Sequence, residues 1–161
     1  MTDHSPDPTD RDPHRTLEAQ VDIRATPTQV WAVVSDVSRT GEWSPECRRV
    51  LVRGPLEVGS TFVGINQRGP VVWPTRCRVT VLEPERLLAF RVKESGATWV
   101  YELEPIPEGT RLTERREHSG AETRVGRFFS TRLLGGASEH ADELADGMRY
   151  SLRRIKDIVE G

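Results

Sequence analysis

Three polar side chains fall on strand faces that otherwise carry apolar residues, and they are the first candidates for chemistry. Asn66 lies on the same side of its strand as Phe62. Glu114 and Arg116 share a side with Leu112. An inward polar group loses free energy unless it finds a hydrogen-bond partner. These side chains could therefore orient a carbonyl or hydroxyl group of a ligand. Alternatively a bulge shifts the register, or the two charged groups pair with each other or with a neighbouring strand.

Aromatic residues share the same inward side of the expected strands. They are Phe62, Trp73, Phe90, Trp99 and Tyr101. Together with Met148 from a later helix they would border one space. Small-molecule cavities of roughly 300 to 1,000 Å³ are usually lined in this way, with few polar groups. The same residues could equally fill a core, and the sequence leaves both alternatives open.

Other chemistries find little support. Cys47 and Cys77 are isolated, with no CxxC motif and no histidine at metal-ligand spacing, so we interpret them as small packing residues. The histidines are far apart and form no ligand pattern: His4, His14, His118 and His140. A Ser/His/Asp set, a Cys/His pair and a phosphate-binding loop are also absent from the sequence. No metal and no other cofactor is therefore predicted.

Length and charge restrict the class of protein. A chain of 161 residues is most simply one domain, large enough to bury roughly 70% of its unfolded surface. The net charge of -2 provides no positive field for a phosphate backbone, so nucleic acid is not an expected partner. No apolar run approaches the roughly 20 residues that a membrane span requires, which argues against stable membrane insertion.

The first fifteen residues differ from the rest. They contain no apolar residue after Met1, so we expect residues 1–15 to form a disordered, acidic and proline-rich tail. The tail has neither the basic start nor the apolar stretch of a secretory signal. A cytoplasmic protein is therefore expected.

The first structured elements can be read from local patterns. Residues 17–24 alternate between apolar and polar, which predicts a half-buried strand. Thr26 is followed by Pro27 and, three positions after the threonine, by Gln29, the pattern of a capping box at a helix start. This helix should be short and packed on one face. That face carries Val30, Val33, Val34 and Val37.

Six further strands are indicated by runs separated by glycine and proline. They cover residues 47–54, 60–69, 71–84, 86–95, 97–105 and 110–118. Gaps of hairpin length predict an antiparallel meander. In the third run the inward side is expected to carry Trp73, Thr75, Cys77, Val79 and Val81.

The last forty residues are helical in pattern. From Ser138 onward, apolar residues recur at helical spacing over some 22 residues, a length of roughly 33 Å. They are Leu144, Met148, Leu152, Ile155 and Val159. The preceding segment, residues 124–129, pairs arginine with two phenylalanines. We interpret it as a flap over a cavity mouth, with Phe128 as a ligand contact, rather than as a membrane contact. Gly135 and Gly136 then form a break or hinge.

This order of elements predicts an α+β fold with two short helices between the first and second strands. A curled sheet of about seven strands must wrap around the long C-terminal helix, which alone can cover so wide an apolar face. One helix cannot fill that face completely, so a cavity is expected between helix and sheet. Trp43 has no local role in its turn, since turns are built by small polar residues, glycine and proline. Its indole should therefore point into one end of the cavity.

Several segments, together with this order, resemble a known family. They are VDIRATPTQVWAVVSDVSRTGEWSPECRRV, TFVGIN, ATWVYELEP, GTRLTE and GMRYSLRRIK. The chain from about residue 16 to its end resembles the polyketide cyclase/dehydrase branch of the START-like (SRPBCC) superfamily. The resemblance implies a single START-like domain, residues 16–161, with a helix-grip fold. It is weak for function, because members bind lipids, polyketides or hormones, and many are not enzymes.

The first functional hypothesis is binding of a hydrophobic small molecule, lipid-like or polyketide-like, for carriage or sensing. The second, implied by the resemblance, is an aromatase/cyclase that folds and closes a poly-β-keto chain. Tyr101, Glu114 and Arg116 are then the only candidates for its acid or base. The third is a protein-interaction module of co-chaperone or toxin–antitoxin type. The sequence does not determine whether the protein is a monomer or a dimer.

Overall fold

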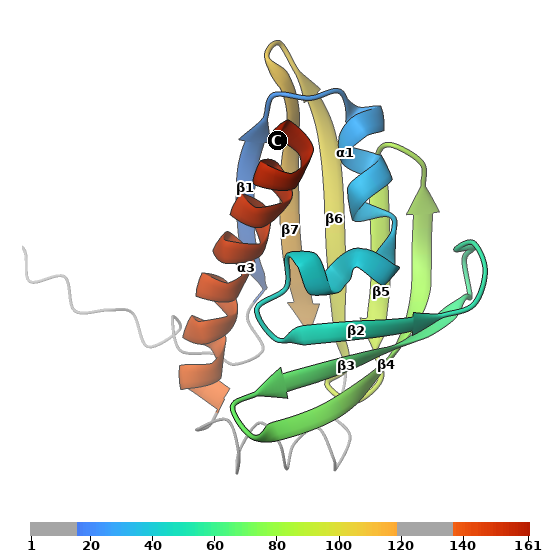
Figure 1. The fold of residues 1–161 in the computed structure, drawn as a ribbon, viewed down its shortest axis with the longest axis vertical. Helices are drawn as coiled ribbons and strands as arrows, with labels where there is room; N and C mark the ends of the chain where they lie inside the picture. Colours follow the sequence, from blue (N-terminus) through green and yellow to red (C-terminus); the bar gives the residue numbers. More distant parts are fainter. Residues whose placement is uncertain (1–15, 119–136) are drawn as a thin grey trace, which may run out of the picture.

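The computed structural model describes residues 16–118 and 137–161 (Figure 1). Its strands are β1 (Leu17–Ile23), β2 (Cys47–Val52), β3 (Thr61–Arg68), β4 (Val71–Glu83), β5 (Leu87–Val92), β6 (Ala97–Ile106) and β7 (Gly109–His118). Its helices are α1 (Pro27–Val34), the 3₁₀ helix η2 (Val37–Glu42) and α3 (Ala137–Glu160). The strands form one antiparallel sheet in the order β1-β7-β6-β5-β4-β3-β2. The predicted meander is therefore confirmed, with β1 closing the far edge against β7.

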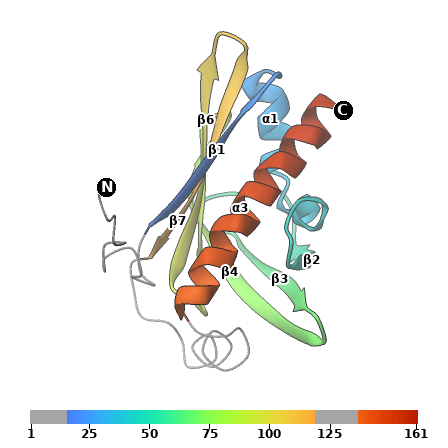
Figure 2. The ribbon, with the colours of Figure 1, turned by 90° about the vertical axis from the view of Figure 1, so that its left-hand side faces the viewer.

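All three helices lie on the same side of the sheet, and the sheet curls toward them (Figures 1 and 2). The helix α3 runs across the concave side and buries Met148, Leu152 and Ile155 against it. These side chains recur at helical spacing, so a single apolar stripe faces the sheet. The α+β helix-grip architecture is confirmed.

The start of α1 has the predicted chemistry. The backbone N–H of Gln29 donates to the Thr26 hydroxyl (3.2 Å), and the N–H of Thr26 donates to the Gln29 side chain (2.9 Å). Two otherwise unpaired donors are thereby satisfied. The inward face of the helix buries its valines in the core: Val30, Val33 and Val34.

Replacing Thr26 with alanine is expected to lower the free energy of unfolding by about 1 kcal/mol, because the cap hydroxyl is lost. Thr26→Ser keeps the hydroxyl and should retain most of the stability. Urea denaturation of both variants measures the difference. Equal destabilisation by the two substitutions would show that the hydroxyl is not the stabilising group.

A β-bulge in β4 corrects one detail of the predicted strand faces. The pairing register between β4 and β5 shifts between Val79 and Val81. Beyond the shift Leu82 pairs with Leu88, a fully buried core residue, and Leu82 packs on the core. The prediction that Val81 faces inward was wrong, because the extra residue of the bulge reverses the alternation after it.

Some expectations fall outside the described residues. The tail, residues 1–15, and the segment 119–136 are not described. The predicted flap with Phe128 and the hinge at Gly135 and Gly136 lie in the second of these ranges. Among the described helices, none has the length and hydropathy needed to cross a bilayer.

Candidate functional site

A cavity of about 260 Å³ lies between α3 and the sheet. Every predicted ligand-contact residue that the structure describes lines this cavity: Trp43, Phe62, Asn66, Trp73, Phe90, Trp99, Tyr101, Glu114, Arg116 and Met148. The expected cavity is therefore present and the polar candidates reach it. That these residues bind a ligand remains a prediction.

Aromatic rings from three strands pack against one another along the cavity wall. The rings of Phe62 and Phe90 meet edge to face, with centroids 5.2 Å apart and planes at 69°. Phe90 and Tyr101 stack with centroids 6.5 Å apart. Such arrangements are favourable beyond the area they bury. They fix this part of the wall, so that a flat apolar molecule would meet an ordered surface.

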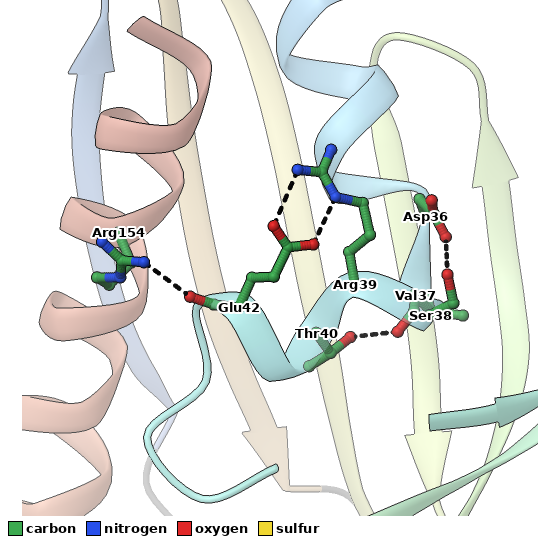
Figure 3. Close-up of polar contacts among 7 residues, drawn as sticks. All are labelled: Asp36, Val37, Ser38, Arg39, Thr40, Glu42 and Arg154. Carbon is green, nitrogen blue, oxygen red and sulfur yellow. Dashed lines mark hydrogen bonds and ion pairs between the residues drawn. The ribbon is translucent and has the colours of Figure 1, made fainter. Parts of the chain in front are cut away.

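Short-range polar contacts build the helix η2, which precedes Trp43 (Figure 3). The Thr40 hydroxyl donates to the carbonyl of Val37 (2.6 Å), and Arg39 forms an ion pair with Glu42 (2.6 Å). From α3, Arg154 donates to the backbone carbonyl of Glu42 (3.3 Å). These contacts hold η2 in place beside α3.

Trp43 follows directly and is only 3% exposed. Its backbone N–H donates to the carbonyl of Thr40 (3.2 Å). Gly41 allows the turn to approach β2, because a Cβ atom there would lie 2.8 Å from the carbonyl oxygen of Arg48. The turn is thus positioned so that the indole of Trp43 forms part of the cavity wall, as its place in the sequence predicted.

The polar end of the cavity is formed by a tyrosine and a glutamate on neighbouring strands. Tyr101 and Glu114 are directly paired between β6 and β7, and the Tyr101 hydroxyl donates to Oε1 of Glu114 (3.1 Å). Both residues are buried, at 8% and 3% exposure. Glu114 therefore pairs with a neighbouring strand, which was one of the alternatives left open by the sequence.

Burial controls the protonation of this pair. Desolvation raises the pKa of Glu114 to about 8, although the hydrogen bond from Tyr101 acts in the opposite direction. Burial, followed by the nearby Glu114, raises the pKa of Tyr101 well above its ordinary value. At neutral pH most of the molecules therefore carry two uncharged, hydrogen-bonded acids at this end of the cavity.

Asn66 is held by the sheet. Its amide donates to the carbonyl of Trp73 (3.3 Å) and to the hydroxyl of Thr75 (3.1 Å), both on β4. The two donor positions of its amide nitrogen are thus used within the protein. Asn66 contributes an ordered polar wall at the β3–β4 side of the cavity.

The two cysteines also line the cavity, which the sequence did not indicate as a role for them. Both are buried and free. Burial raises the pKa of Cys47, and it raises that of Cys77 to about 12. The thiolate is the reactive form, so these thiols are poor nucleophiles. Among the described residues, no three histidine, cysteine or acidic side chains are placed to hold a metal ion.

Charged residues from three distant parts of the chain meet at the edge of the cavity. Glu46 and Glu143 belong to its lining, and Arg68 at the end of β3 forms an ion pair with Glu143 on α3. Burial raises the pKa of Glu46, while the positive charge of Arg68 lowers it. The ion pair is partly exposed, so we place it at the rim. No local sequence signal connects these residues, because Glu46 lies in the loop before β2, Arg68 at the end of β3 and Glu143 on α3.

Breaking the rim ion pair with Arg68→Met is expected to speed the exchange of an apolar fluorescent probe several-fold, because β3 and α3 lose a cross-connection there. Stopped-flow fluorescence measures the rate. Arg149→Met is the control, since Arg149 pairs with Asp146 within α3 alone. Unchanged exchange in Arg68→Met would show that the ion pair does not limit entry.

Comparison with known proteins places the chain in a family. The profile of the family "Polyketide cyclase / dehydrase and lipid transport" matches residues 14–160. The chain belongs to this family. A search of curated proteins finds no match.

Three solved structures that resemble this chain illustrate the range of similarity. The Polyketide_cyc-like protein Cgl2372 from Corynebacterium glutamicum is 37% identical, with 90% of this chain and 91% of that chain covered and a TM-score of 0.59. The Zhui aromatase/cyclase from Streptomyces sp. R1128 is 16% identical, with 91% and 93% covered and a TM-score of 0.67. The di-domain ARO/CYC StfQ from the steffimycin biosynthetic pathway is 14% identical, with 94% and 53% covered and a TM-score of 0.70. At these lower identities the last two share the fold.

Proposed function

We propose that this protein binds a small, mainly apolar molecule in the cavity between α3 and the sheet. The observation that carries the proposal is an interior space of about 260 Å³ walled by aromatic rings. This volume lies just below the roughly 300 to 1,000 Å³ that is usual for small-molecule sites, so the ligand should be compact. Membership in a family described as including lipid transport supports this function.

A second candidate is acid catalysis on a carbonyl compound, as in a cyclase. The observation that favours it is Glu114, a buried acid with a pKa of about 8 on the cavity wall. A general acid works best when its pKa lies near the working pH. Zhui and StfQ, which share the fold, are aromatase/cyclases, and this is compatible with such a reaction. Binding comes first because it requires only the cavity, whereas catalysis also requires a substrate held against Glu114.

The interaction-module hypothesis, in contrast, predicts a filled interior. The observed cavity argues against it.

The test is to fill the cavity from α3. Ser151 is buried on the helix face that lines the cavity, so Ser151→Leu should occupy part of the space. We expect the neutral probe N-phenyl-1-naphthylamine to bind the wild type and Ser151→Ala, and to bind Ser151→Leu at least tenfold more weakly. Absence of binding to the wild type, or equal binding to all three proteins, would contradict the proposal.

A co-purified ligand would identify the natural class. Native mass spectrometry of protein isolated from its own host is expected to show a bound molecule that Ser151→Leu lacks. A ligand found equally on both proteins would place the binding site elsewhere.

A further inference from the structure

The outer face of the sheet lies opposite the helices (Figure 2), and along β4 and β5 it carries a block of four positive charges. Arg78 and Arg91 are direct cross-strand partners. The backbone N–H of Lys93 donates to the carbonyl of Arg76 (2.8 Å), so these two residues lie opposite each other two positions further along. Cys77, between Arg76 and Arg78, lines the cavity, so both arginines point to the other side of the sheet. The four cations therefore share one surface.

Three of these four cations have no acidic partner among the residues that the structure describes. Arg76 forms an ion pair with Glu94 (2.6 Å). The other described ion pairs include none of Arg78, Arg91 and Lys93, and all three are exposed. Like charges directly opposite on neighbouring strands destabilise a sheet. The block is therefore unfavourable for the folded protein by itself.

The other half of the same face is electrically balanced. On β7, Arg111 pairs with Asp22 of β1 (2.9 Å), and Arg115 pairs with Glu102 of β6 (2.7 Å). The excess of positive charge is thus local to β4 and β5, although the whole chain has a net charge of -2. A local field of this kind favours a negatively charged partner.

Exposed apolar side chains lie directly beside the positive block. Leu51 on β2 pairs with Val63 on β3, which pairs in turn with Arg76. Leu51 is 48% exposed, and Val72 on the outward side of β4 is 55% exposed. Pro74, also exposed, lies between Val72 and Arg76 on the same side of β4. The partner should therefore offer both negative charge and apolar contact.

These features favour one kind of partner. A second copy of the chain would bring the same cations together, and like charges across an interface are repulsive. Single-stranded nucleic acid binds through aromatic side chains on which its bases stack. The aromatic side chains of the strands instead line the cavity on the other face: Phe62, Trp73, Phe90, Trp99 and Tyr101. An anionic bilayer provides phosphates for the cations and an apolar boundary for the exposed aliphatic groups.

We propose that the outer face of β2 to β5 docks on the surface of a bilayer that contains anionic lipids. The four cations contact headgroup phosphates, and the exposed apolar side chains of β2 and β4 lie at the boundary between headgroups and acyl chains. The contact is peripheral, since none of the described helices can cross a bilayer. Because this face lies on the opposite side of the sheet from the cavity, the inference does not depend on what the cavity binds.

Vesicle flotation tests the inference on the wild-type protein. The vesicles are an equimolar mixture of phosphatidylglycerol and phosphatidylcholine, with phosphatidylcholine alone for comparison. We expect binding to the anionic vesicles to be about tenfold tighter or more, and to weaken as salt is added, because salt screens the charges. A net charge of -2 by itself would oppose such binding, so a local positive patch is required. Equal or undetectable binding to both kinds of vesicle would overturn the inference and leave the proposed function standing.

A charge reversal then locates the contact. Arg78→Glu replaces the repulsion from Arg91 with an attraction, so the melting temperature should not fall, whereas the affinity for anionic vesicles should fall about tenfold. Arg86→Glu is the control, because it changes the net charge equally at the β4–β5 turn, where Arg86 pairs with Glu83. It should bind anionic vesicles nearly as the wild type does. Equal losses in the two variants, or no loss in Arg78→Glu, would show that this face does not make the contact.

The apolar part of the surface separates a bilayer from an acidic protein. Leu51→Ser should weaken binding to anionic vesicles about threefold or more, because an apolar side chain no longer enters the interface. Tyr150→Ser is the control, since Tyr150 is also exposed (43%) but lies on α3. Soluble poly-glutamate offers charge without an apolar phase and should bind the wild type more weakly than the vesicles do. If poly-glutamate binds as tightly as the vesicles and Leu51→Ser has no effect, the partner is an acidic polymer and the inference is overturned.

Discussion

Replacing Glu114 with glutamine is expected to stabilise the protein increasingly as the pH rises from about 4.5 to about 8. In the unfolded chain this carboxyl group ionises near pH 4.5, whereas burial raises its pKa in the folded protein to about 8. Between these values the folded protein keeps a proton that the unfolded chain releases. The stability contributed by neutral Glu114 is therefore complete below the lower value and is lost as the pH rises through the higher one.

The expected effect is large. The two pKa values differ by roughly 3.5, and each pH unit between them changes the free energy of unfolding by about 1.4 kcal/mol. The total change across this range is therefore about 5 kcal/mol. Glutamine has no proton to release, and its side-chain oxygen can still accept the hydrogen bond from Tyr101. Urea denaturation at pH 5 and pH 8 should show that the advantage of Glu114→Gln over the wild type is several kcal/mol greater at pH 8.

A surface glutamate provides the control. Arg39 lowers the pKa of Glu42, which lies in an exposed ion pair (Figure 3). Glu42→Gln should therefore gain nothing relative to the wild type as the pH rises. Arg116, the next inward residue after Glu114 on β7, is present in both the wild type and Glu114→Gln. Its charge therefore does not contribute to the difference between their pH dependences. An unchanged difference between Glu114→Gln and the wild type at the two pH values would mean that Glu114 is ionised in the folded protein.

Much of the fold follows from local patterns in the sequence. The alternation of β1 and the capping box of α1 are short-range features, and both appear in the structure as predicted. Trp43 was informative because no turn requires an indole, so its partner had to come from elsewhere in the fold. The bulge in β4 was not predictable in this way. Val81 and Leu82 are both apolar, so neither side of the strand is marked as the inward one.

For the site, the sequence predicted which side chains lie on the inward faces of their strands, but not which of them contact one another. Alternation indicated that Tyr101 and Glu114 point inward, but their hydrogen bond depends on the register between β6 and β7. The rim contact of Arg68 with Glu143 depends on how α3 crosses the sheet. Glu94 was missed as well: it is buried on the cavity wall and accepts hydrogen bonds from the backbone N–H (2.8 Å) and the guanidinium (2.6 Å) of Arg76. Such pairings arise from tertiary structure, which one sequence does not specify locally.

Truncating Trp99 is expected to separate binding from packing. Trp99 lines the cavity and is only partly buried, so its removal enlarges a space that already exists. We expect Trp99→Ala to lower the free energy of unfolding by less than the roughly 3 to 5 kcal/mol that is typical when an aromatic residue in a filled core is truncated. The affinity for N-phenyl-1-naphthylamine should fall at least tenfold, because the ring surface that the probe contacts is lost.

Leu112→Ala provides the opposite case. Leu112 is fully buried in the core and does not line the cavity, so its truncation should cost about 2 to 5 kcal/mol and leave the affinity of the folded protein nearly unchanged. Trp73, at 9% exposure, also lines the cavity, and Trp73→Ala should lose both stability and affinity. Urea denaturation and probe titration of the three variants measure both quantities. If Trp99→Ala loses as much stability as Leu112→Ala and keeps its affinity, the tryptophan packs as core, and the ligand does not contact this wall of the cavity.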